Sequence, residues 1–149
     1  MGQVNILNKE EVLKKIFIKK NGKNYIFVNF ISSSNIKNKH YELPIISIKN
    51  KNGPIVLLIG ANHGDETEGF ISLLKLINNI KLKEINGHLI IIPALNLPAL
   101  NSGQRVSLSD GVDMNRSFYK NNNNSLTFKI SNFLKESIIP NVEIILDIH

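Results

Sequence analysis

Three short apolar runs constrain the fold of this chain more than any other sequence feature. They occupy residues 55–59 (Ile-Val-Leu-Leu-Ile), 89–92 (Leu-Ile-Ile-Ile) and 142–146 (Val-Glu-Ile-Ile-Leu). Continuous or nearly continuous apolar runs of this length are typical of parallel β-strands that are buried on both faces. We therefore expect three buried strands, each covered by other elements on its two sides.

Helical patterns separate the predicted strands. Apolar residues recur at helical spacing over residues 70–77, and a second helix is expected from an N-cap at Ser125 to about residue 139, where Pro140 stops it. Between them, residues 96–124 are expected to form a long loop, and loops of that length are usually functional or disordered. The order strand, helix, strand, loop, helix, strand predicts an α/β fold, a layered sheet with helices on its faces.

The first part of the chain has a different character. Residues 24–32 and 41–49 are rich in β-branched and aromatic residues and predict two strands, whereas residues 9–17 fit either a short helix or a strand entry. A turn rich in Asn and Gly separates this part from the apolar runs. We expect a β-rich N-terminal lead at residues 1–50 and a second unit at residues 51–149.

The composition excludes several functional classes. The chain has no cysteine, so any bound metal must be held by histidine or carboxylate side chains. No apolar run reaches the length of a membrane span, and residues 1–6 lack the apolar segment of a secretory signal. We therefore expect a cytoplasmic protein with no membrane partner.

The net charge of +6 raises the question of a nucleic-acid partner. The lysines are scattered, however, without interleaved aromatic residues, so we expect no nucleic-acid partner and keep basic-surface binding as a minor alternative. Only two of the 18 basic residues are arginines, Arg105 and Arg116. The planar guanidinium grips carboxylates and oxyanions with two bonds, which a lysine cannot do. Retention by chance is the alternative interpretation.

A histidine and a carboxylate follow the first buried run. His63 and Glu66 lie three residues apart between a strand and a helix, where both side chains can point to one place. His149 ends the third predicted strand, and two histidines with one glutamate form the ligand set of catalytic zinc sites that keep an open position for water. The alternatives are a carboxylate that caps a helix beside an incidental histidine, and a hydrogen-bonded polar residue at a strand end. His40 and His88 are expected at the surface or at strand edges.

The segment Asp113-Met-Asn115-Arg116 also carries candidate functional groups. Asp113 could accept a hydrogen bond from the far ring nitrogen of His63 and so fix its tautomer. Asn115 and Arg116 could hold a substrate carboxylate, and Arg105 could face the oxygen that becomes negative in a tetrahedral intermediate. The alternative is an ordinary turn, which Asp110, Gly111 and Asp113 also favour.

These motifs together resemble the succinylglutamate desuccinylase/aspartoacylase family, which is related to the zinc carboxypeptidases. The resemblance is strongest to its N-acetyl-diaminobutyrate deacetylase branch and covers roughly residues 40–149. The motifs occur in the order of the family: Gly-Ala-Asn-His-Gly-Asp-Glu at 60–66, Pro-Ala-Leu-Asn-Leu-Pro-Ala at 93–99, Arg105, Asp-Met-Asn-Arg-Ser-Phe at 113–118, and Leu-Asp-Ile-His at 146–149.

The resemblance implies a three-layer α/β/α fold with a mixed, largely parallel sheet. It implies one zinc ion per chain, bound by His63, Glu66 and His149, and hydrolysis of the amide bond of a small N-acyl amino acid. It further implies that Arg105 polarises the scissile carbonyl and that Asn115 and Arg116 bind the substrate carboxylate.

The chain departs from the family in two places. The family usually continues Arg-x-Phe-Pro-Gly, where this chain has Phe118-Tyr119-Lys120. Family members also continue past the third ligand, and their general-base glutamate lies in that part. We therefore expect residues 51–149 to be the N-terminal part of a truncated catalytic domain. The alternative to a deacylase is a non-catalytic zinc-binding fragment of a truncated or split gene, which forms a homo-oligomer or acts beside a complementing C-terminal polypeptide.

Overall fold

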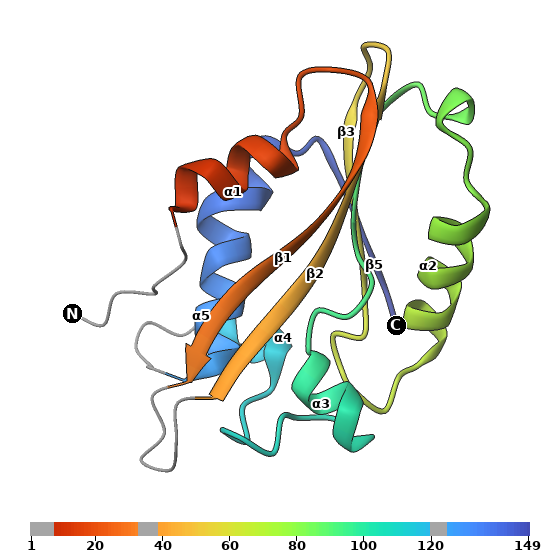
Figure 1. Ribbon diagram of the computed structural model, residues 1–149. Coiled ribbons are helices and arrows are strands. Elements are labelled where there is room, and N and C mark those ends of the chain that lie inside the picture. The colour runs from red at the N-terminus through yellow and green to blue at the C-terminus, as the bar shows by residue number, and fades with distance from the viewer. Residues whose placement is uncertain (1–7, 33–38, 120–124) are drawn as a thin grey trace.

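The computed structural model describes residues 8–32, 39–119 and 125–149 and shows a five-stranded mixed sheet between two layers of helices (Figure 1). Residues 1–6, on which the expectation of no secretory segment rests, lie outside the described residues. The strands are β1 (Gly22–Ser32), β2 (Lys39–Asn50), β3 (Ile55–Gly60), β4 (Gly87–Ile92) and β5 (Ile144–Ile148).

The strand order across the sheet is β1-β2-β4-β3-β5. β3 pairs in parallel with both β4 and β5, while β2 pairs antiparallel with β1 and β4, so that β2 alone runs against the other four strands. The two strands of the N-terminal lead therefore extend the same sheet that the apolar runs form. This arrangement confirms the predicted α/β class and the mixed, largely parallel sheet.

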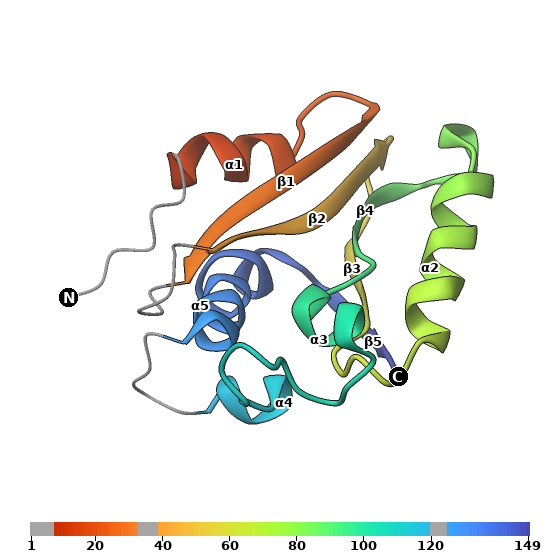
Figure 2. The ribbon, with the colours of Figure 1, turned by 60° about the horizontal axis from the view of Figure 1, so that its bottom comes forward.

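Helices cover both faces of the sheet (Figures 1 and 2). α1 (Lys9–Ile16) and α5 (Leu126–Phe133) lie on one face, and α2 (Glu68–Asn79) lies on the other. A π-helical turn and a short 3₁₀ turn prolong α5 to Asn141. Among the described residues, no helix combines the length and apolar character needed to cross a bilayer.

The central strand β3 is buried from both sides, as its apolar run predicts. Leu57 contributes to the core under α1 and α5 and is 0% exposed, whereas its neighbour Leu58 contributes to the core under α2 and is 8% exposed. Leu73 and Ile77 of α2 complete the second core, but Leu74, expected on the same apolar face, is exposed. Burial of such side chains is the main force that holds layers of this kind together.

The expectation for β5 was wrong in one respect. Residues 144–148 form the expected parallel strand, but Ile144, Ile145 and Leu146 are 47%, 42% and 52% exposed rather than buried. β5 lies at one edge of the described sheet and pairs only with β3. Edge position alone is not the reason, because the opposite edge strand β1 buries Val28 and Phe30 under α1 and α5. Among the described residues, β5 contributes no side chain to that core, and only its Ile148 packs against the core under α2.

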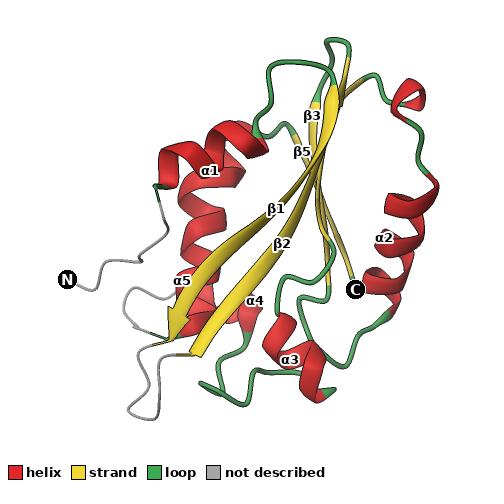
Figure 3. Cartoon of the chain, viewed as in Figure 1, coloured by secondary structure: helices red, strands yellow, loops and turns green. Residues whose placement is uncertain are grey.

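The long loop expected at residues 96–124 contains two short helices, α3 (Leu97–Ser102) and α4 (Met114–Ser117). Its last residues, 120–124, lie outside the described part. Asparagine and aspartate side chains begin both helices: Asn96 accepts from the backbone N–H of Ala99, and Asp113 accepts from that of Asn115. Such capping satisfies amides that a first helical turn leaves unpaired. Figure 3 shows both helices among the loops at one end of the sheet.

His88 is not a surface or strand-edge residue, contrary to expectation; it is 4% exposed. The Ser47 hydroxyl donates to the carbonyl of Ile16 at 2.6 Å, so it accepts the 2.8 Å hydrogen bond from Nε2 of His88. Burial and the nearby charge of Lys49 lower the pKa of His88. The pair ties α1 to the sheet through neutral groups. The side chain of His40 lies outside the described residues.

Candidate metal centre

A tight turn after β3 positions the first two candidate ligands. The backbone of Ala61 has a φ of 49°, a left-handed conformation that is uncommon for a residue with a side chain. Backbone hydrogen bonds from Leu95 to Gly60 and from Asn96 to Ala61, both 2.9 Å, hold this turn against the end of β4. The turn leaves His63 almost fully buried, with its side chain 2% exposed.

Two glycines allow the surrounding segments to approach the turn closely. A Cβ atom on Gly64 would collide with the backbone of Ala99 in α3, and one on Gly69 would collide with the carbonyl group of Ile148 in β5. The second contact holds the start of α2 against the end of β5, next to which the C-terminus lies in Figures 1 and 2. His149 is thereby brought beside the turn that carries His63.

Three side chains converge at this place. Nδ1 of His63 lies 3.0 Å from Oε1 of Glu66, and Nδ1 of His149 lies 2.5 Å from Oε2 of the same carboxylate. One ligand atom from each of the three residues lies within 4.8 Å of the others. Two imidazole nitrogens and one carboxylate oxygen at this spacing can hold a metal ion.

The far nitrogen of each histidine faces a second carboxylate. Nε2 of His63 lies 3.3 Å from Oδ1 of Asp113, and Nε2 of His149 lies 3.2 Å from Oδ2 of Asp147. A carboxylate only accepts, and Glu66 faces the two Nδ1 atoms in the same way, so a proton can sit on either nitrogen of each ring. With a metal ion between the rings and Glu66, each Nε2 would keep its proton and each Nδ1 would be the ligand atom. Such pairs orient the ring and increase its basicity as a ligand. The structure thus brings Asp113 to the position expected from the sequence.

Asp147 was not assigned a role from the sequence. The signal that could have found it is the spacing Asp-x-His on a strand, because residues two apart point to the same face. In this position Asp147 does for His149 what Asp113 does for His63. The two histidines therefore have the same kind of partner, although one is buried and the side chain of the other is 42% exposed.

The charges of the cluster shift the pKa values of its members. Burial alone would raise the pKa of Glu66, but the hydrogen bonds from His149 and His63 outweigh it and lower the pKa. Burial is likewise outweighed at Asp113, whose pKa is lowered mainly by His63. The hydrogen bond to Glu66 raises the pKa of His149. A metal ion that binds at Nδ1 of His149 would compete with a proton there.

The two arginines singled out from the sequence differ in how close they lie to the cluster. Arg105 is half exposed and reaches two carboxylates of the cluster, Glu66 at 3.4 Å and Asp113 at 3.5 Å, so its guanidinium borders the candidate metal position. Arg116 is exposed at the end of α4 and forms no ion pair within the described residues.

Asn115 is connected to the cluster by a hydrogen bond from Asn62, a residue that the sequence analysis did not single out. Asn62 is 3% exposed and immediately precedes His63. Its side-chain amide nitrogen lies 2.7 Å from Oδ1 of Asn115 and 2.8 Å from Oδ2 of Asp147. No simple sequence pattern predicts this residue, because its contacts come from segments 53 and 85 residues away.

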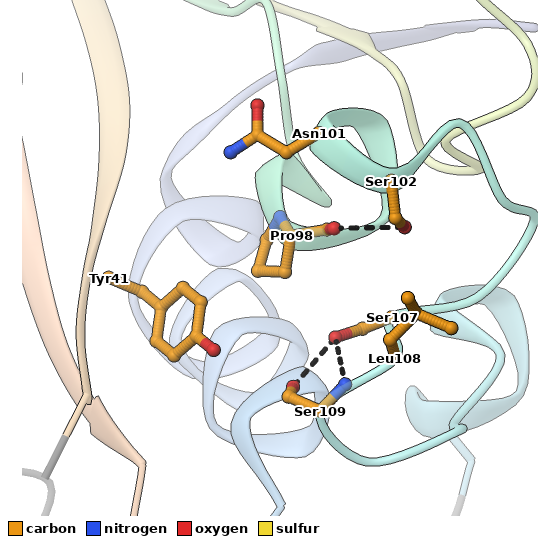
Figure 4. A pocket seen from close by; sticks show the side chains of 7 residues that line it. All are labelled: Tyr41, Pro98, Asn101, Ser102, Ser107, Leu108 and Ser109. Carbon is orange, nitrogen blue, oxygen red and sulfur yellow. Dashed lines mark hydrogen bonds between the residues drawn. The ribbon is translucent and has the colours of Figure 1, made fainter. Parts of the chain in front are cut away.

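A separate hollow of about 310 Å³ lies between β2 and the loop of α3 (Figure 4). Its lining includes Tyr41, Pro98 and Ser107, with hydroxyl, amide and apolar groups but no histidine or carboxylate among the described residues. The Ser107 and Ser109 hydroxyls are 2.7 Å apart and bond each other. Because its described lining offers no histidine or carboxylate that could bind a metal, this hollow is not the candidate metal centre.

Comparisons with known proteins agree with this geometry. A sequence profile described as the succinylglutamate desuccinylase/aspartoacylase catalytic domain matches residues 52–149. The N-alpha-acetyl-L-2,4-diaminobutyric acid deacetylase of Halomonas elongata is 38% identical over 107 residues, which are 72% of this chain and 31% of that protein.

Solved structures show the same likeness. The succinylglutamate desuccinylase/aspartoacylase of Rhodobacter sphaeroides superposes with a TM-score of 0.80 at 35% identity, covering 88% of this chain and 41% of that one. The product-bound ectoine utilization protein EutE (DoeB) of Ruegeria pomeroyi gives 0.80 at 34% identity, covering 87% and 40%. This chain therefore spans less than half the length of these relatives.

Proposed function

Because the chain belongs to the succinylglutamate desuccinylase/aspartoacylase family, we propose that it forms part of a zinc-dependent hydrolase that cleaves the amide bond of a small N-acyl amino acid. The observation that carries the proposal is the convergence of His63, Glu66 and His149, each histidine backed by its own carboxylate. The name of the Halomonas elongata relative, a deacetylase of an N-acetylated amino acid, supports the substrate class.

The donor set fits zinc. Two neutral imidazoles and one carboxylate are the protein ligands of many catalytic zinc sites, in which a fourth position stays open. The absence of cysteine excludes a thiolate site, and three oxygen and nitrogen donors are too few for the calcium sites that proteins build from six to eight oxygens. When bound, zinc would supply Lewis-acid chemistry, lowering the pKa of water and polarising a carbonyl oxygen.

The surrounding side chains would bind and orient the substrate. Arg105, beside Glu66 and Asp113, can donate to the acyl oxygen as negative charge develops on it. Asn115 and Arg116 on α4 can hold the carboxylate of the amino acid, the first by its amide and the second by its guanidinium fork. Asp113 and Asp147 hold the two imidazoles in the tautomer that leaves Nδ1 for the metal.

The general base would come from another part of the enzyme. Glu66, Asp113 and Asp147, the carboxylates of the cluster, each face a histidine, and the resemblance places the family's base beyond the third ligand. Because the relatives are more than twice as long as this chain, we propose catalysis for a protein of the full family length.

Metal content is the first test. The chain purified without chelators should hold about one zinc ion, and Glu66→Ala should reduce this content sharply. A folded chain that binds no zinc at micromolar concentration would overturn the proposal. In a protein of family length, Arg116→Lys should raise KM for N-acyl amino acids more than it lowers kcat, because a point charge cannot reproduce the fork.

A second candidate is a zinc-binding unit that becomes active only beside a complementing polypeptide. The exposed strand β5 and the exposed His149 favour it, since a further strand and its cover would bury both. The test is to add the remaining part of the Halomonas elongata relative as a separate polypeptide. Tighter zinc binding and new deacetylase activity would support complementation, whereas self-association of the chain would indicate a second copy at this edge instead.

A further inference from the structure

Asn62 forms a hydrogen-bonded link between the candidate metal centre and the candidate substrate site. Its amide nitrogen has two protons, and its two acceptors come from different segments: Asp147 Oδ2 at the end of β5 and Asn115 Oδ1 on α4. The same Asp147 oxygen also accepts from Nε2 of His149. One side chain therefore contacts both the group that orients a proposed ligand and a proposed substrate-binding amide.

The direction of each hydrogen bond in this link follows from Asp147. An ionised carboxylate can only accept, so Asn62 must turn its NH₂ group and not its oxygen toward Asp147. The second proton of that NH₂ group then points to Asn115, which must present its oxygen in return. The NH₂ group of Asn115 is left facing the other way, and it bonds no acceptor among the described residues.

The link is maintained although it leaves one polar atom without a partner. Oδ1 of Asn62 is buried and accepts no hydrogen bond within the described part of the chain. A buried unsatisfied oxygen is unfavourable, so packing alone does not explain an amide here. The two N–H donors are the property that an apolar or acidic residue of similar size would lack.

We propose that Asn62 is a positioning residue that fixes the orientation of the Asn115 amide, so that the N–H groups of Asn115 face the carboxylate of the substrate. Asn62 is itself held by Asp147, the carboxylate that orients His149. The assignment rests on the proposed deacylase function for the identity of the ligand. The orientation of Asn115 itself follows from the hydrogen bonds alone. Substrate binding and metal binding are therefore coupled through Asp147.

The orientation can be measured directly on the folded chain by ¹H–¹⁵N NMR of side-chain amides. The Asn62 NH₂ protons should exchange slowly with solvent, since both are donated inside the protein. The Asn115 NH₂ protons should exchange fast, and their signals should shift when N-acetylglycine is added as a carboxylate probe. A protected Asn115 NH₂ group, or one that does not respond to the probe, would overturn the assignment.

The variant Asn62→Asp tests the link by removing both donors at almost constant size. We expect the Asn115 amide to reverse and become protected, and the shift with N-acetylglycine to fall at least tenfold. Zinc affinity should fall about tenfold, the low end of the effect of partners that orient ligands. Unchanged values for both would show that Asn62 has no positioning role.

Asn96→Asp is the matched control. Asn96 is also a buried asparagine at a strand end, but it uses only its oxygen, as the cap of α3, and its nitrogen bonds nothing in the described structure. An aspartate there introduces the same charge and keeps the cap. The response to N-acetylglycine and the zinc affinity of Asn96→Asp should stay within about twofold of those of the parent chain. If both quantities fall only in Asn62→Asp, then the added buried charge is not the cause.

The double variant Asn62→Asp/Asp147→Asn restores a hydrogen bond between the exchanged side chains but not the donor that Asn115 needs. The atom of residue 147 that faces residue 62 would be an NH₂ group, which cannot also accept from Nε2 of His149, so zinc affinity should stay low. The probe response should stay low as well, because Asn115 still faces an acceptor. Recovery of the probe response would overturn the proposed orientation. A chain that binds no zinc but shows the expected Asn115 exchange would refute the zinc function while leaving the orientation intact.

Discussion

His63 and His149 reach the same carboxylate from neighbouring parallel strands, but their surroundings are opposite. His63 follows β3, which lies between β4 and β5, and its side chain is 2% exposed. His149 follows the edge strand β5, and its side chain is 42% exposed. Each has a carboxylate at its far nitrogen, at 3.3 and 3.2 Å.

The difference shows that two candidate ligands of the same chemistry can be held in place in two ways. Around His63, the turn lies against the backbone of α3 and the ring is almost fully buried. Around His149, the described contacts are those of β5 with the start of α2, of its ring with the ring of His63, and of its two nitrogens with Glu66 and Asp147. The β3 side is therefore held by packing, and the β5 side by charge and hydrogen bonding.

The largest expected effect is on stability, at one pair of residues. Leu57 of β3 and Ile145 of β5 are direct register partners, yet Leu57 is 0% exposed and Ile145 is 42% exposed. Leu57→Ala should destabilise the chain by about 2–5 kcal/mol because it leaves a cavity. Ile145→Ala should cost about 0.5–1 kcal/mol.

Urea unfolding of both variants, with the slope of the transition compared, checks this prediction. Equal costs would mean that β5 is covered in solution, by a second copy of the chain or by another polypeptide, and the contrast between the strands would disappear. Dilution separates these cases, since only self-association makes the cost depend on protein concentration.

Removal of either histidine should weaken zinc binding on the order of 100-fold. This figure follows from dividing the binding free energy of four-ligand zinc sites equally among the ligands, which gives about 3 kcal/mol for each. The two variants should differ in the metal-free chain. His63→Ala leaves a buried gap and should lower stability, whereas His149→Ala should change it little. Competition with a chromophoric chelator and urea unfolding measure the two quantities, with His88→Gln as a histidine control outside the site.

For the carboxylates that face the histidines, we expect the larger loss of zinc affinity on the β5 side, at Asp147, and the smaller loss at Asp113. Loss of a carboxylate that orients a ligand typically lowers metal affinity about 10–100-fold. Because packing also holds His63, Asp113→Ala should lie near the low end of this range and Asp147→Ala near the high end. If Asp113→Ala weakened zinc binding more, then the buried ring would depend on its hydrogen bond and not on packing.

The smallest expected effect concerns a third histidine, His88, which is buried like His63 but has only neutral partners. Its pKa is lowered by burial and by Lys49, so below about pH 6.5 the unfolded chain binds a proton that the folded chain does not. The contribution of neutral His88 to the free energy of unfolding should therefore be fully present above about pH 6.5. It should fall as the pH drops from there through the lowered pKa of His88 in the folded state. The slope is limited to about 1.4 kcal/mol per pH unit.

Urea unfolding at several pH values between 7.5 and 5, with a chelator present, measures this slope. His88→Gln can keep the bond to Ser47 without a titrating group, so its profile should be flatter than that of the parent chain. His149 has a raised pKa and acts with the opposite sign, so both proteins should be compared in a His149→Ala background. An equally steep profile for His88→Gln would assign the pH dependence to other groups.

The sequence was sufficient for the parts of the molecule that local patterns determine. The apolar runs predicted β3 and β4, and the position of His63 and Glu66 after a strand predicted that they approach one another. The exposure of β5 was not predictable, because its apolar run is like that of β3 and only the sheet order distinguishes an edge strand from a central one. The short helices α3 and α4 depend on single capping side chains and gave no periodic signal.

Of the candidate site, the sequence indicated only the side chains that can bind a metal. Histidine and glutamate spacing indicates ligands because the chemistry restricts which side chains can bind a metal. Asn62 and Asp147 act through hydrogen bonds between distant segments. The left-handed conformation before Asn62 is adopted by Ala61, a residue type for which the sequence does not predict it. The burial of His88 depends on Ser47, 41 residues earlier in the chain, on the neighbouring antiparallel strand.

The bond between Glu66 and His149 joins residues 83 positions apart. In polymer terms, any ion that holds both residues closes a loop of that length in a chain with no disulfide to close one. Permanent closure of such a loop would remove roughly 4–5 kcal/mol of conformational entropy from the unfolded state. A metal ion that stayed bound to both residues during unfolding would restrict the unfolded chain in this way, an effect that does not depend on how well β5 is packed.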